Sequence, residues 1–478
     1  MRLPRLPFAA LAALSAACGT GGDGPDPGLS PAPAPAPVPA ETVTPPPPEP
    51  PKPPPPEPPA PSCTKDADCP GGRCADVGSG LKACVRTKSC TGGDGAGAKC
   101  GGVAGDEKAV GSDDCCRTLA VPGGTFDQFN DTRYPAKVSP YLLDAYEVTA
   151  GRFRAWVEAT DGNLRASAPK AGAAAHPRVP NSGWRDEWNQ FLPTSRAEVD
   201  MMLGPEGCQV GSNVDDWGAL TWWTPALEAK VAAAHPNDPA ILAENTRAAL
   251  DAKPLNCVPW HVLFAFCAWD GGRLPTNAEW GFAASGGSEQ RAFPWGTPPA
   301  DQMVRIAGRS DLSLVPVFAY GAKYTTSQLY EPTWGANVFP DHYAHTWGTP
   351  WRLQSDNAAH IAPVGRKVPG NGKWGHADLA GGMHEWMLDE GPARPGACDD
   401  CANVSWPAPD ALDPNAPELT PDFQHQWYYG GARVVRGGAW DNSLLLAVKQ
   451  TPLEVRVYTS YPVRRTYRAL GGRCARDL

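Results

Sequence analysis

The protein has 478 residues, enough for one large domain with accessory segments or for two to three domains of ordinary size. Its 55 prolines and 51 glycines predict long irregular segments, and its 18 tryptophans predict a core built from large aromatic side chains. The formal net charge is −9 and no run of basic residues occurs, which argues against a nucleic-acid partner.

Residues 1–17 have the pattern of a lipoprotein-type signal peptide. Two arginines precede an apolar run over residues 6–17 that is too short to span a bilayer. The run ends before Cys18, which we expect to be lipidated and to anchor the protein to a membrane. Gly19, rather than aspartate, follows it, as in outer-membrane lipoproteins. We therefore expect an exported protein of the cell envelope, with ordinary secretion after Ala17 as the alternative.

Residues 18–62 form a proline-rich linker that favours polyproline II and would hold the folded part away from the membrane. Residues 63–116 contain eight cysteines and form a disulfide-rich module. Its first part, residues 63–89, is too short to fold on a hydrophobic core alone, and residues 90–116 lead into the large domain. The chain beyond Cys18 has 14 cysteines, an even number, which in an exported protein indicates disulfides. The spacings lack the facing Cys-x2-Cys pairs of a zinc site. The connectivity within residues 63–116 stays open.

Residues 117–478 read as one large domain of short strands, helices and long loops. Residues 141–148 alternate as a strand, and Thr149 then caps a helix with one apolar face. Pro259 opens a second helix, and Thr276 begins a capping box that starts a third.

Seven short motifs occur in order along this domain. They are VPGGTF at 121–126, YEVT at 146–149, RLPTNAEW at 273–280, FPWG at 293–296, GGMHEW at 381–386, VVRGG at 434–438 and GGRC at 471–474. The ordered set resembles the formylglycine-generating enzyme (sulfatase-modifying factor) family. The resemblance implies an α+β, C-type-lectin-like fold with little regular secondary structure.

The resemblance also implies two structural calcium sites, each made of carboxylate or amide side chains and backbone carbonyls, the oxygen ligands that calcium prefers. The first comprises Asp378, Gly381, Met383 and Glu385. The second comprises Asn337, Val338, Asp356 and Ala358. The alternative for the first site is that its carboxylates are ordinary loop residues.

Three disulfides are expected within the large domain. The resemblance implies a bridge between Cys267 and Cys474, and the even number of cysteines leaves Cys208 and Cys257 as a further pair. Cys398-Asp399-Asp400-Cys401 is a Cys-x-x-Cys motif in an apparent loop without the strand and helix of a thioredoxin, so a structural bridge is expected there. A redox centre is its alternative role.

Oxidases of the resembled family carry two redox cysteines that bind copper, and the matching positions here are Asn442 and Ala447. Neither residue supplies a soft sulfur ligand, so copper and catalysis by the family mechanism are not expected. We expect instead a non-catalytic domain that binds or scaffolds an unknown protein or small molecule. Its groove is expected near His384, Trp386 and Trp440.

Two other functions are compatible with the sequence. One is an enzyme, either a formylglycine-generating oxidase that converts a sulfatase cysteine or another oxidoreductase that uses Cys398 and Cys401. The other is a purely structural surface protein without a ligand. Copper loading with a Cys-x-Pro-x-Arg peptide assay distinguishes the first of these readings from a binding module.

Overall fold

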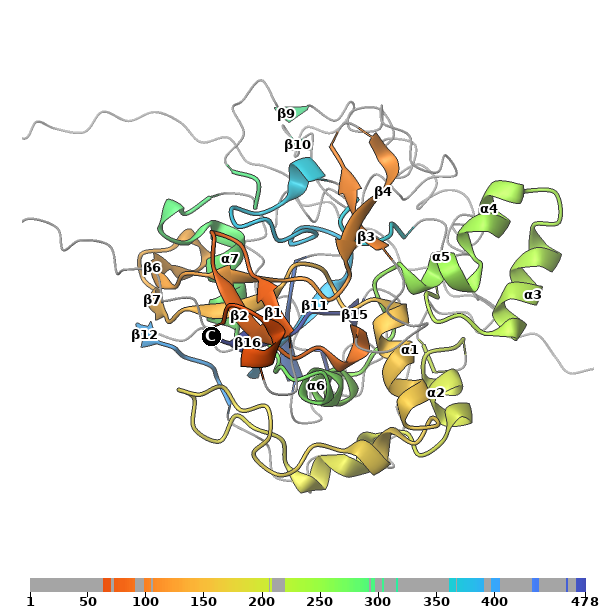
Figure 1. Ribbon diagram of the computed structural model, residues 1–478, viewed down its shortest axis with the longest axis horizontal. Helices are drawn as coiled ribbons and strands as arrows, with labels where there is room; N and C mark the ends of the chain where they lie inside the picture. Colours follow the sequence, from red (N-terminus) through yellow and green to blue (C-terminus); the bar gives the residue numbers. More distant parts are fainter. Residues whose placement is uncertain are drawn as a thin grey trace, which may run out of the picture. The chain divides into compact units, whose positions relative to one another are not determined.

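The computed structural model describes residues 63–69, 73–90, 99–104, 106–205, 207–208, 220–291, 294–296, 303–304, 315–316, 361–366, 368–390, 397–404, 432–437, 461–462 and 470–478. Contacts group Met1–Glu57 and Pro58–Leu478 into two separate units, and all the elements below belong to the second (Figure 1). No helix in these ranges is both long and apolar enough to cross a membrane.

Three helices begin where the sequence predicts. In α1 (Ala150–Ala159) the Thr149 side chain accepts a hydrogen bond from the Arg152 amide. Helix α6 (Trp260–Trp269) follows Pro259, and α7 (Asn277–Ser285) starts with a complete capping box at Thr276. The threonine caps of α1 and α7 satisfy amide groups that the first turn of a helix leaves without partners, whereas Pro259 makes no side-chain cap.

Four further helices lie between α1 and α6 in the sequence. They are α2 (Arg196–Met202), α3 (Pro225–Ala234), α4 (Pro239–Glu244) and α5 (Arg247–Asp251). Each follows a Ser, Thr or Asp whose side chain accepts a backbone hydrogen bond. Helices α3 and α4 lie at the edge of the unit in Figure 1.

The described strands form small sheets. The largest has the order β14-β13-β11-β15, and two three-stranded sheets have the orders β12-β7-β6 and β16-β8-β5. Their strands are β5 (Thr118–Val121), β6 (Gly124–Asp127), β7 (Pro135–Val138), β8 (Tyr141–Asp144), β11 (His384–Glu390), β12 (Cys398–Asp399), β13 (Ala432–Arg436), β14 (Tyr461–Pro462), β15 (Leu470–Gly471) and β16 (Ala475–Asp477). The other strands form three two-stranded sheets. These pair β1 (Arg73–Asp76) with β2 (Lys82–Val85), β3 (Lys99–Val103) with β4 (Asp106–Asp114), and β9 (Met303–Val304) with β10 (Val315–Pro316).

Strand β8 is shorter than predicted. It ends at Asp144, four residues before the expected end at Val148. After Asp144 the backbone leaves the sheet, and the Val148 amide instead donates to the carbonyl of Gly472. This irregular stretch carries Glu147, whose position matters for the site described below.

The core has the aromatic character that the composition predicts. Strand β11 is buried on both faces because Trp386 and Leu388 join the cluster around α6, whereas Met387 joins Trp280 of α7. Edge-to-face contacts fix the ring packing, as between Trp188 and Trp260, whose centroids lie 5.3 Å apart.

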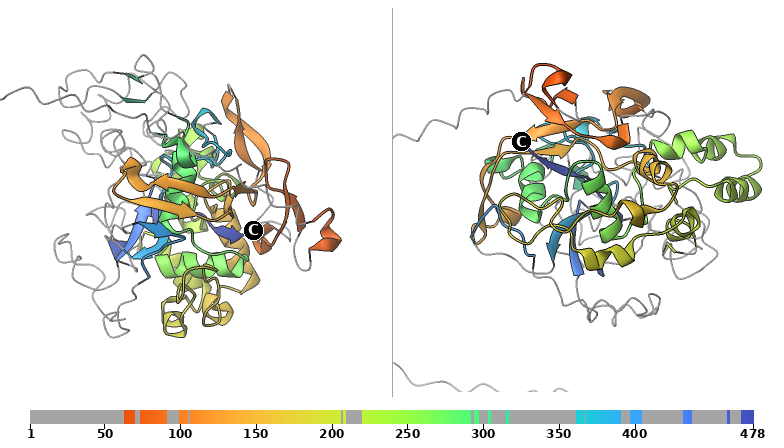
Figure 2. Two further views of the ribbon diagram at one scale, coloured as in Figure 1. Left: turned by 90° about the vertical axis from the view of Figure 1, so that its left-hand side faces the viewer. Right: turned by 60° about the horizontal axis from the view of Figure 1, so that its bottom comes forward.

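The cysteine-rich segment packs directly on the larger domain. Val77 and Val85 of the β1–β2 region share an apolar cluster with Leu142 of β8, and the Ser89 amide donates to Asp270 over 2.7 Å. These contacts join the cysteine-rich segment to the larger domain within the unit Pro58–Leu478. Figure 2 shows the β1–β2 and β3–β4 hairpins on the outside of this unit.

Seven disulfides occur in the described residues, and together they include all fourteen cysteines after Cys18. The three bridges expected in the large domain are confirmed. In the cysteine-rich segment the pairs are Cys63–Cys74, Cys69–Cys84, Cys90–Cys116 and Cys100–Cys115.

Candidate functional site

The first predicted calcium motif lies in a buried acidic cluster, which we define as Glu147, Asp378 and Glu385 together with Arg473. The side chains of Glu385 and Arg473 are fully buried and form a two-pronged ion pair, with N–O distances of 2.6 and 2.8 Å. Asp378 accepts a hydrogen bond of 2.6 Å from the Gly365 amide. The acidic cluster therefore contains three carboxylates and one guanidinium.

The loop before β11 positions these groups through its backbone. Asp378 has a φ of 58°, and the following Gly381 and Gly382 have φ values of 93° and 68°, all in the left-handed region. A Cβ on Gly382 would lie only 2.7 Å from a Glu147 oxygen, so a larger residue there would displace Glu147. The Met383 amide donates to Glu147 Oε1 over 2.7 Å.

The three carboxylates of the acidic cluster outnumber its one guanidinium. Burial, together with the nearby Asp378 and Glu385 carboxylates, raises the pKa of Glu147 well above its ordinary value. Its second oxygen, Oε2, is buried and receives no hydrogen bond. Buried carboxylates that lack neutralising partners require either a proton or a cation. Carboxylate oxygens are the ligand type that a hard divalent cation such as calcium prefers, although the ligand oxygens of these three carboxylates do not all lie within 4.8 Å of one another.

Sequence reasoning found part of this cluster and missed two members. Asp378 and Glu385 were predicted, and both lie in the cluster, whereas Arg473 and Glu147 were not assigned to it. Glu147 does belong to the YEVT motif, which was the available signal. The residues proposed for the second calcium site, Asn337, Val338, Asp356 and Ala358, lie outside the described ranges, as do Cys18, Asn442 and Ala447.

The groove expected near His384 and Trp386 is not found at these residues. Trp386 is fully buried in the α6 cluster, and its indole nitrogen donates to the Val258 carbonyl over 2.8 Å. His384 is also buried. Both faces of β11 are covered, so the prediction of a groove surface at Trp386 is wrong. Trp440 lies outside the described residues.

An open groove of about 730 Å³ occurs elsewhere, beside β6, β7 and β12. Cys398 of the Cys-x-x-Cys bridge lines it, together with Thr125, Lys137 and Gln290. We call it the β6–β7 groove. No feature of the sequence predicted that the bridge would lie at a groove.

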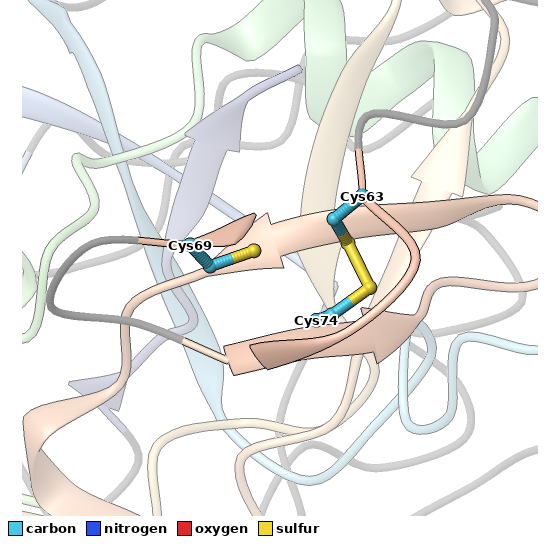
Figure 3. A group of neighbouring side chains, drawn as sticks. All are labelled: Cys63, Cys69 and Cys74. Carbon is cyan, nitrogen blue, oxygen red and sulfur yellow. A yellow bond between two sulfur atoms is a disulfide. The ribbon is translucent and has the colours of Figure 1, made fainter. Parts of the chain in front are cut away.

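Two groups in the described residues have the spacing of a metal site, one of three cysteines and one of two cysteines with Asp114, but every cysteine in them is bonded in a disulfide. One comprises Cys63, Cys69 and Cys74. Figure 3 shows the Cys63–Cys74 bridge with the Cys69 sulfur nearby, and Cys69 is itself bonded to Cys84. The other contains Cys90 and Cys116, which are bonded to each other. Metal binding needs thiolates, so neither group is a metal centre while these bridges are intact.

Comparison with known proteins shows which family this domain resembles. A family model described as a sulfatase-modifying factor enzyme 1-like domain matches residues 105–332 and 317–478. The formylglycine-generating enzyme of Thermomonospora curvata is 26% identical over 340 residues, which cover 67% of this chain and 82% of that protein. The inactive C-alpha-formylglycine-generating enzyme 2 of Mus musculus is 30% identical over 186 residues, covering 37% of this chain and 49% of that protein. The solved structure of PvdO from Pseudomonas aeruginosa has a TM-score of 0.34 at 16% identity, and the match covers 76% of this chain and 94% of that chain.

Proposed function

The chain belongs to the sulfatase-modifying factor enzyme 1-like family, and we propose that it is a lipid-anchored envelope protein whose domain binds or scaffolds a partner without catalysing the family oxidation. One observation carries this proposal. Every cysteine in the described residues is committed to a disulfide, and the only other cysteine in the chain is Cys18.

The chemistry of the family oxidases makes this observation relevant. Their copper ion is held by two thiolates, and at the matching positions this chain has Asn442 and Ala447. An amide oxygen and a methyl group do not replace soft sulfur ligands. The chain has no other unbridged cysteine within the domain to supply them.

The relatives include one named as an active enzyme and one named as inactive. The Thermomonospora curvata relative is named as a formylglycine-generating enzyme and the Mus musculus relative as an inactive one. Family membership alone therefore does not distinguish an oxidase from a non-catalytic binding module. The distinction depends on the residues that are available to bind copper. They favour the binding module.

A copper and peptide assay tests the proposal. The exported chain is titrated with copper and then incubated in air with a peptide containing Cys-x-Pro-x-Arg, and mass spectrometry detects any aldehyde. We expect neither stoichiometric copper nor aldehyde, while the Thermomonospora curvata relative serves as the active reference. Aldehyde formed with one copper per chain refutes the proposal. A Cys398→Ala/Cys401→Ala variant then shows whether that pair supplied the sulfur.

Calcium is the cofactor we propose for the acidic cluster. The carboxylates of Glu147, Asp378 and Glu385 would hold the ion, and the family pattern adds the carbonyls of Gly381 and Met383. When bound, calcium supplies positive charge that offsets the buried carboxylates and ties the loop before β11 to the segment before α1. Its role is structural.

The membrane anchor is proposed from residues 1–18 alone. Replacement of Cys18 by alanine removes the expected acylation site, so the Cys18→Ala protein should leave the membrane fraction. Fractionation of cells that express each form measures this. Equal membrane retention of the two forms would contradict the lipid anchor and favour another mode of attachment.

A further inference from the structure

The Cys398–Cys401 bridge differs from the other described bridges in two ways. It closes a sequence separation of only 3 residues, whereas the other six close separations of 11 to 207. It is also the one bridge of the seven in which neither cysteine is buried. A short ring restrains the unfolded chain less than a long one does, so this bridge contributes least to stability in the chain-entropy model. Both cysteines are half-buried, and Cys398 lines an open groove through which an external thiol can reach it.

The two sulfurs of the bridge lie in different surroundings. Cys398 lines the β6–β7 groove, and its Sγ accepts a hydrogen bond from Gln128 Nε2 over 3.6 Å. Cys401 does not line the groove. A thiol that enters the groove therefore meets Cys398 first, and the Gln128 amide is placed to stabilise negative charge on that sulfur.

The ring is held in place by contacts that do not involve sulfur. Strand β12 pairs in parallel with β7, with Cys398 opposite Ala136. Asp400 accepts hydrogen bonds from the amide and hydroxyl of Ser139, over 2.6 and 2.7 Å. These contacts can keep the two cysteines close when the bridge is open, which is what a reversible dithiol requires.

We propose that Cys398 and Cys401 form a thiol–disulfide exchange site and that the β6–β7 groove receives a cysteine-containing segment of an exported polypeptide. The groove volume of about 730 Å³ lies within the range of ligand sites and exceeds what one cysteine side chain fills. The oppositely charged Lys137 and Asp399, which are paired at its rim over 3.1 Å, offer polar contacts to a peptide. This inference is independent of the proposed loss of copper chemistry.

The exchange balances without another oxidant. A thiolate of the polypeptide attacks Cys398 Sγ, a mixed disulfide forms, and the bond to Cys401 breaks with Cys401 leaving as a thiolate that takes a proton from solvent. A second thiolate of the polypeptide then attacks its own sulfur in the mixed disulfide, and Cys398 leaves as a thiolate that accepts the Gln128 hydrogen bond. Two electrons pass from the polypeptide to the cysteine pair.

Trapping variants test which sulfur reacts. Cys401→Ser leaves Cys398 as a thiol and Cys398→Ser leaves Cys401. Each variant is mixed with a peptide whose single cysteine carries an aryl disulfide, and release of the coloured aryl thiolate gives the rate. We expect Cys401→Ser to react roughly ten-fold faster than Cys398→Ser, and Gln128→Leu in the Cys401→Ser background to slow it. Gln190→Leu, an exposed change that touches no sulfur, serves as the control in the same background.

The unaltered protein provides a second measurement that does not depend on a variant folding. Native protein is treated with a limiting amount of a dithiol peptide, alkylated and mapped by mass spectrometry. The proposal is supported if Cys398 and Cys401 are alkylated before any other cysteine. Earlier opening of another bridge, or equal reactivity of the two serine variants, overturns it. Equal rates for the aryl disulfide of the peptide and that of free cysteine would overturn the groove as the peptide site.

Discussion

The acidic cluster makes a quantitative prediction for Glu147→Gln. The glutamine keeps an oxygen that can accept the Met383 amide hydrogen bond, but it removes one carboxylate from the three around Arg473. Calcium at 100 times its dissociation constant stabilises a protein by about 2.7 kcal/mol. For a chain of this size that corresponds to a rise in melting temperature of roughly 3 °C. A variant that binds calcium 100-fold more weakly would keep only about 0.4 kcal/mol of the effect.

The effect of pH on this variant follows from the raised pKa of Glu147. The native protein holds this proton at pH values where the unfolded chain has released it, so without calcium the stability should fall as pH rises above about 4.3, the ordinary glutamate value. The fall should end once pH exceeds the raised native pKa. Calcium binds the ionised form, so its stabilisation should grow over the same range. Glu147→Gln should remove the pH dependence of the stability and the pH dependence of the calcium effect.

Thermal unfolding with and without a calcium chelator measures these effects. Glu158→Gln is a matched control, because Glu158 lies outside the acidic cluster and pairs with Arg247 at the exposed surface. It should keep the full calcium effect. An unchanged melting temperature of the unaltered protein on chelation would refute the calcium assignment. Equal calcium stabilisation in Glu147→Gln would refute the role of Glu147.

Two further predictions concern stability. Loss of the Cys267–Cys474 bridge, which closes a sequence separation of 207, should cost about 5 kcal/mol in the chain-entropy model, whereas loss of the Cys398–Cys401 bridge, with a separation of 3, should cost roughly 2 kcal/mol. Denaturant unfolding of the paired alanine variants checks this, and a reversed order would contradict the entropic account. Thr276→Ala should cost about 1 kcal/mol in the same assay, since the Thr276 hydroxyl accepts the Glu279 amide hydrogen bond at the start of α7; no measurable loss would mean that Glu279 caps α7 alone.

Helix starts were predictable because their causes are local. The caps at Thr149 and Thr276 depend on hydrogen bonds to residues three positions further along the chain. The end of β8 at Asp144 was not predictable in this way. The backbone there pairs with Gly472, more than 300 residues away, and that contact overrides the local alternation.

The error at Trp386 has a physical cause as well. A groove was expected near it because lectin-like folds present a concave loop surface, but β11 is covered by the α6 cluster on one face and by α7 on the other. A strand buried on both faces lacks the regular alternation that marks one face as exposed, and its residues do not show which cluster each will join.

Taken alone, the residues of this chain determined its family, the positions of its main helices, the use of its cysteines in bridges and the absence of cysteine at positions 442 and 447. These properties reside in short motifs, in residue identity and in an even number of thiols. The tertiary structure decided which distant polar groups share one buried site, as the Glu147 carboxylate and the Met383 amide do across 236 residues, and which bridge lies at a groove. Those properties depend on contacts between segments far apart in the chain, and no local pattern encodes them.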